Sequence, residues 1–64
     1  MKVFKVIFDL DDEMLKTYAM CNFVLTTDAD KAVQFIIEKY TNLQGYYTKI
    51  MYVYEENDEG IFSP

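Results

Sequence analysis

The chain of 64 residues has no histidine, no tryptophan and no arginine, and it has only one cysteine, one proline and two glycines. Without histidine there is no Ser-His or Cys-His catalytic pair and no imidazole to bind a metal. The one cysteine, Cys21, can form neither a zinc cluster nor an internal disulfide. We therefore expect no enzymatic activity, no metal and no cofactor.

Long apolar runs are also missing. No stretch approaches the roughly twenty apolar residues of a membrane helix, and Met1-Lys2-Val3 leads directly into a strand pattern rather than a signal peptide. A single cysteine fits a reducing compartment. We therefore expect a cytoplasmic protein without membrane contact.

What the chain does have is apolar and acidic side chains. Hydrophobic residues make up 52% of it and aromatic residues 17%, which is too apolar for a disordered chain. Acidic residues outnumber lysines eleven to six, so the net charge is −5. Because a negative protein repels phosphate backbones, we do not expect it to bind nucleic acid directly.

Four periodic segments predict the secondary structure. Residues 2–10 alternate between a fully apolar face and a mixed face, which indicates a strand. Residues 16–26 are rich in β-branched and aromatic types and follow a turn of about five residues, so the two strands should form a hairpin. Residues 28–42 carry apolar side chains at helical spacing, and Thr27 is positioned to cap this helix. Residues 46–55 predict a third strand with two largely apolar faces.

These elements predict an α+β fold of the ββαβ type. A hairpin followed by a helical crossover places the third strand beside the first. The expected sheet is therefore mainly antiparallel, in the order 2-1-3, with one helix packed on one face. Residues 1–56 would form this single domain, and residues 57–64 would form an acidic C-terminal tail.

The sheet face away from the helix is expected to be nearly as apolar as the face that meets it. A sheet in a two-layer domain normally has one polar face, and a large exposed apolar patch usually marks an interface. We therefore expect this face to meet a protein partner, with a homodimer as the simplest case. The alternative is that the tail covers the patch with Ile61 and Phe62. Cys21 is expected to be buried. The expected interface side chains are Val3, Ile7, Tyr18, Met20, Val24, Tyr46, Tyr52 and Tyr54.

Acidic residues form two runs, which the expected topology places at opposite ends of the sheet. Their members are Asp11, Asp12, Glu13, Glu55, Glu56, Asp58 and Glu59. The plainest interpretation is solvated acidic turns. A calcium loop of the EF-hand type would need glycine at its sixth position, where Met14 stands. If a dimer joined the two runs, they could imitate the phosphates of nucleic acid and block a basic groove on another protein.

The segment from Lys5 to Asp12 resembles the first motif of the haloacid dehalogenase superfamily, an apolar strand that ends in Asp-x-Asp. The resemblance implies Asp9 as nucleophile and Asp11 as general acid, with magnesium beside them. Glu13 replaces the threonine of that family, and the family's parallel, doubly wound sheet needs a longer chain. We therefore expect that the protein is not a magnesium phosphatase.

The pattern of the whole chain resembles small strand-strand-helix-strand proteins found in phage and prophage genomes. The matching pieces are Lys2 to Phe8, Thr27 to Val33, Lys49 to Glu56, and Gly60-Ile61. The resemblance implies a phage accessory protein in the host cytoplasm, such as an anti-CRISPR-like inhibitor. We expect a non-enzymatic, protein-binding inhibitor of a basic host nuclease or another nucleic-acid-processing or defence protein. The alternative is a self-associating structural or assembly protein.

Overall fold

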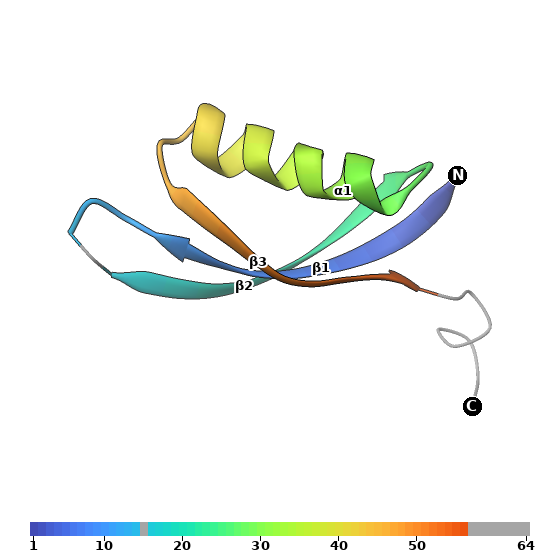
Figure 1. Ribbon diagram of the computed structural model, residues 1–64, viewed down its shortest axis with the longest axis horizontal. Coiled ribbons are helices and arrows are strands. Elements are labelled where there is room, and N and C mark those ends of the chain that lie inside the picture. The colour runs from blue at the N-terminus through green and yellow to red at the C-terminus, as the bar shows by residue number, and fades with distance from the viewer. Residues whose placement is uncertain (15, 57–64) are drawn as a thin grey trace.

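The computed structural model describes residues 1–14 and 16–56 (Figure 1). Its elements, in chain order, are β1 (Lys2–Asp11), β2 (Thr17–Thr26), α1 (Ala29–Ile36), the π-helical segment η1 (Ile37–Asn42) and β3 (Tyr47–Glu56). The strands form one sheet in the order β2-β1-β3, and both neighbouring pairs are antiparallel. The α+β class and the strand order expected from the sequence are confirmed. The expected tail, residues 57–64, lies outside the described residues.

The alternation of β1, the central strand, decides the two faces of the sheet. Its buried side chains face the helix, and the residues between them point to the opposite side. The buried set is Phe4, Val6, Phe8 and Leu10. On the β3 side the register shifts between Ile7 and Phe8, so Met51 is an extra residue in β3. This β-bulge explains why the third strand alternates weakly in the sequence.

The core is one layer of side chains between the sheet and the helix. Among the described residues, eight are buried: Phe4, Val6, Phe8, Leu10, Val24, Ala32, Ile36 and Tyr40. The rings of Phe8 and Tyr40 pack with their centroids 5.3 Å apart. The Tyr40 hydroxyl accepts a hydrogen bond from the side-chain amide of Asn22 at 2.9 Å. The Tyr40 hydroxyl is therefore satisfied by a hydrogen-bond partner inside the protein.

Helix α1 begins after Asp28 rather than after Thr27. Asp28 has an extended backbone, and its Oδ1 accepts a hydrogen bond from the Lys31 amide at 2.9 Å. The prediction that Thr27 caps the helix is therefore wrong by one position. Both residue types cap helices well, so burial of Ala32 and Ile36 against the sheet sets the helical register and selects Asp28.

The last part of the helix widens into π geometry. In η1 the amide of Leu43 donates to the carbonyl of Glu38, five residues back, at 3.0 Å. The wider turn keeps Tyr40 buried but leaves Leu43 74% exposed, although regular helical spacing predicts that Leu43 faces the sheet. Gly45 then takes a φ of +83°, the left-handed conformation in which many helices end and which glycine adopts without strain.

Candidate interaction surface

The sheet face away from α1 has no described element packed on it (Figure 1). We call it the open face. Five rows of three side chains cross it, each with one residue from β2, one from β1 and one from β3. In order from the start of β1, the rows are Leu25–Val3–Glu56, Phe23–Lys5–Tyr54, Cys21–Ile7–Tyr52, Ala19–Asp9–Lys49 and Thr17–Asp11–Tyr47.

Large apolar and aromatic side chains dominate the open face. Six of them leave between 44% and 70% of their surface in solvent: Phe23, Leu25, Tyr47, Met51, Tyr52 and Tyr54. They come from both edge strands and flank Ile7, which is only half-buried in the centre. A contiguous apolar surface of this kind is typical of a protein–protein interface.

Lys5 introduces one positive charge among these rings. Its Nζ lies 5.8 Å from the ring centroids of both Phe23 and Tyr54, which is within cation–π range. Hydrogen bonding to Tyr54 raises the pKa of Lys5, and the charges of Tyr54, Cys21 and Glu56 act in the same direction. Lys5 therefore stays protonated at physiological pH and keeps a fixed positive charge on the open face.

Half of the expected interface side chains lie on the helix side of the sheet instead. Val3, Ile7, Tyr52 and Tyr54 are on the open face as expected. The other four, Tyr18, Met20, Val24 and Tyr46, are not. Val24 is buried in the core, and Met20 and Tyr46 pack against it. Tyr18 meets Tyr46 edge-on, with ring centroids 6.5 Å apart.

The correction follows from the length of the hairpin turn. Phe4 pairs with Val24 and Phe8 with Met20, so even-numbered residues of β1 face the same side as even-numbered residues of β2. The odd-numbered residues of β2 therefore reach the open face, which sequence reasoning missed. These are Ala19, Cys21, Phe23 and Leu25. Cys21, expected to be buried, is exposed for this reason. The signal that could have found them was the odd number of residues between the strands.

At the hairpin end of the sheet, Asp12 organises the turn. Its Oδ1 accepts hydrogen bonds from the amides of Met14 and Lys16, both at 2.9 Å, and its Oδ2 accepts one from the Tyr18 hydroxyl at 3.2 Å. The hydrogen bond to Asp12 raises the pKa of Tyr18, because the carboxylate stabilises the protonated phenol. Asp12 therefore has a structural role typical of aspartate in turns.

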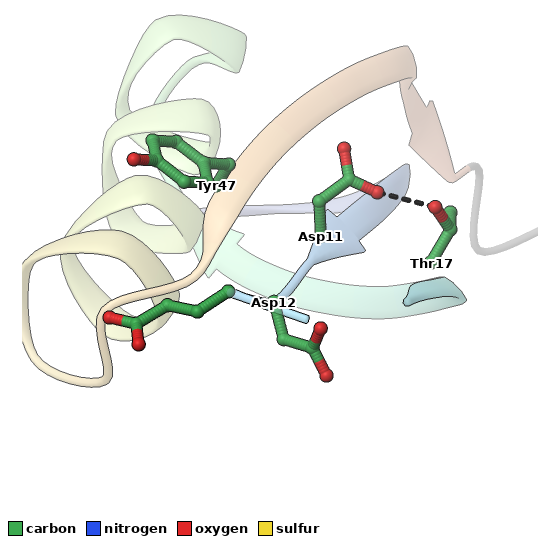
Figure 2. A pocket seen from close by; sticks show the side chains of 5 residues that line it. Asp11, Asp12, Thr17 and Tyr47 are labelled. Atoms are coloured by element: carbon green, nitrogen blue, oxygen red, sulfur yellow. Dashed lines mark hydrogen bonds between the residues drawn. The ribbon is translucent and has the colours of Figure 1, made fainter. Parts of the chain in front are cut away.

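A depression of about 680 Å³ lies at the same end, lined by Asp11, Asp12, Glu13, Thr17 and Tyr47. Figure 2 shows the Asp11 carboxylate accepting a hydrogen bond from the Thr17 hydroxyl, with Asp12 directed elsewhere. The two aspartates are thus occupied by contacts within the hairpin. Among the residues that the structure describes, no three acidic or cysteine side chains gather as metal ligands.

The second acidic run lies at the opposite end of the sheet. The two runs are separated by the length of β1, which is roughly 33 Å for ten residues. Glu55 and Glu56 pair with the start of β1, and Glu55 Oε1 lies 3.5 Å from Lys2 Nζ. The expected members Asp58 and Glu59 lie outside the described residues. The described members of the two acidic runs therefore lie at opposite ends of the sheet, as the topology predicted.

Comparison of the chain with protein-family models, with curated proteins and with solved structures finds no significant match. In the described part of the chain, no helix has the length and apolar character needed to cross a membrane. The three antiparallel strands also differ from the parallel, doubly wound sheet that the Asp-x-Asp motif of residues 9–11 would imply. The open face is thus the feature of the described residues that most needs a functional explanation.

Proposed function

We propose that the protein is a small, non-enzymatic protein-binding module that docks onto another protein through its open face. One observation supports this most directly. Six large apolar or aromatic side chains are exposed together on the sheet face that the helix leaves uncovered. Tyrosine and phenylalanine are enriched at interface cores, because their rings bury much area at little conformational cost.

The two acidic ends suggest the chemistry of the partner. A net charge of −5 would attract a basic protein over a distance of about one Debye length, and the apolar open face would then make the close contact. Together with the phage-type pattern of the chain, this favours an inhibitor. We propose a phage-encoded inhibitor of a basic host nuclease or another nucleic-acid-processing or defence protein.

Two phenylalanines provide a matched test. Phe23 is 61% exposed on the open face, whereas Phe35 is 50% exposed on α1. Wild-type protein, Phe23→Ser and Phe35→Ser would each be immobilised and exposed to a bacterial lysate at about 0.05 M and about 0.5 M salt. We expect that Phe35→Ser and the wild type capture a lysate protein that Phe23→Ser does not. We also expect the wild type to capture less of this protein at the higher salt concentration. Identical capture by all three proteins would contradict the proposal.

A further inference from the structure

We propose that the open face binds a second copy of this chain, in a face-to-face dimer whose two-fold axis crosses the strands at the row of Ile7. The inference rests on the proposed function only in taking the open face as a protein interface, and a second copy would compete with the basic partner for this surface. It goes further because it specifies the position of the two-fold axis, and the axis determines which side chains of the two copies meet.

The exposed area matches the needs of a stable dimer. If each of the six exposed side chains, four of them aromatic, has roughly 200 Å² of surface, together they leave roughly 700 Å² in solvent on this face. Specific interfaces bury about 800 Å² on each partner. The half-buried Val3 and Ile7 lie between these side chains and contribute further area. Stacking two open faces would cover this apolar surface and form a second core about 10 Å thick.

Two of the charges on the open face, those of Lys5 and Asp9, are placed so that they pair between the two copies, whereas Asp11 and Glu56 in the outer rows meet uncharged side chains. Half a turn about the proposed axis exchanges the second row with the fourth. Lys5 then lies opposite Asp9 of the second copy, and Asp9 opposite its Lys5. On β3 the same rotation sets the ring of Tyr54 opposite Lys49. Each dimer thus gains two ion pairs and two cation–π contacts in a partly dehydrated layer.

The shapes of the side chains follow the same symmetry. On β2 the rotation sets Phe23 opposite Ala19, a large ring against a methyl group. The middle row, Cys21–Ile7–Tyr52, meets its own copy on the axis and contains no charge. Alternation of large and small side chains across facing positions is what lets two sheets interdigitate.

The charge pattern also favours this axis over a two-fold axis that runs parallel to the strands. A two-fold axis along β1 would set Lys5 against Lys5 and Asp9 against Asp9 of the second copy. Like charges facing each other in an interface are strongly unfavourable. Opposite charges two positions either side of Ile7 therefore favour the crosswise arrangement.

A competing arrangement joins the copies at their edges. β2 is an edge strand of ten residues, Thr17–Thr26, and none of these residues is charged. Such an edge can pair with another strand. Edge pairing leaves the open face in solvent, so its strength does not depend on Lys5 or Asp9. The two arrangements can therefore be separated by charge reversal.

The test uses full-length protein and sedimentation equilibrium from roughly 10 to 500 μM, in about 0.3 M salt, which screens the repulsion between two acidic chains. Lys5→Asp and Asp9→Lys are examined singly and together. We expect each single reversal to raise the dimer Kd at least about tenfold, and the double variant to return to within about threefold of the wild type. Lys31→Asp makes the same charge change as Lys5→Asp at an exposed site on α1, and it should leave Kd unchanged.

Cys21 provides an independent readout, since the axis passes through its row. Cα atoms of facing sheets lie about 10 Å apart, too far for a disulfide, which needs less than about 7 Å. A short bismaleimide should therefore link two Cys21 thiols, whereas air oxidation should not. Edge pairing of β2 centred near Cys21 would bring these Cα atoms to about 5 Å and allow the disulfide.

Each result decides between the arrangements. A monomer at every concentration overturns the dimer but leaves the proposed function intact, provided that Phe23→Ser still loses a lysate protein. If the single reversals leave the dimer Kd unchanged, or if the double variant does not return to the wild-type Kd, the face-to-face geometry is wrong. Circular dichroism of each variant at the same concentrations distinguishes loss of association from loss of folding.

Discussion

The N-cap of α1 allows a quantitative check of where the helix begins. Asp28→Ala removes the carboxylate that accepts a hydrogen bond from the Lys31 amide at 2.9 Å. Loss of such a cap costs about 1 kcal/mol. Loss of the negative charge at the positive end of the helix adds about 0.5 kcal/mol. Since 1 kcal/mol shifts the melting temperature of a domain of this size by about 4–8 °C, Asp28→Ala should lower it by about 6–12 °C.

Thermal and urea unfolding would measure this loss of stability. Circular dichroism is the suitable probe, because the chain has no tryptophan for fluorescence. Asp28→Asn keeps an oxygen acceptor and should lose only the smaller, charge-dependent part. Thr27→Ala, one position earlier, should stay within about 0.5 kcal/mol of the wild type. If Thr27→Ala were the damaging substitution and Asp28→Ala were neutral, the helix would begin one residue earlier than the structure places it.

Three further substitutions test the core, the turn after the helix, and the hairpin. Ile36 is fully buried, so Ile36→Ala should cost about 2–5 kcal/mol and leave little or no two-state urea transition in so small a domain. Gly45 has a φ of +83° with open space around it, so Gly45→Ala should cost about 1–2 kcal/mol from backbone strain alone, and a shift of the urea midpoint would measure it. The pKa of Tyr18 is raised above 10.0 by its hydrogen bond to Asp12, so this contact stabilises the fold below pH 10 and is lost as the pH rises through the folded-state pKa. Tyr18→Phe should therefore be less stable than the wild type at neutral pH and should lose less stability between pH 9 and about 11.5, and equal alkaline losses would contradict this assignment.

The sequence predicts the elements and the strand order because the patterns behind them are strong. The alternation of residues 2–10, with one fully apolar face, permits only one orientation of the central strand. In β2 both faces are apolar, so periodicity alone could not orient it. Val24 and Phe23 look equally suited to the core, and only the number of residues in the turn decides between them.

At two other places the structure differs from the sequence prediction because of local backbone geometry that the residue types do not indicate. The π-helical turn moves Leu43 into solvent while Tyr40 stays buried. The bulge at Met51 shifts the later residues of β3 by one position, so Val53 and Ile50 face the core although they are three residues apart. For the candidate interface, the turn length in the hairpin and the bulge in β3 explain why the apolar face was predicted while half of its members were not.

The central place of β1 has a consequence for how the chain folds during synthesis. Of the described strands, β1 emerges from the ribosome first, whereas β3, which pairs along its other edge, is made last. An isolated two-stranded hairpin is at best marginally stable in water. The helix alone is also too short to persist. Folding therefore waits for residues 47–56, and a nascent chain that ends before them carries one face of β1 uncovered and one of its edges unpaired, available to chaperones.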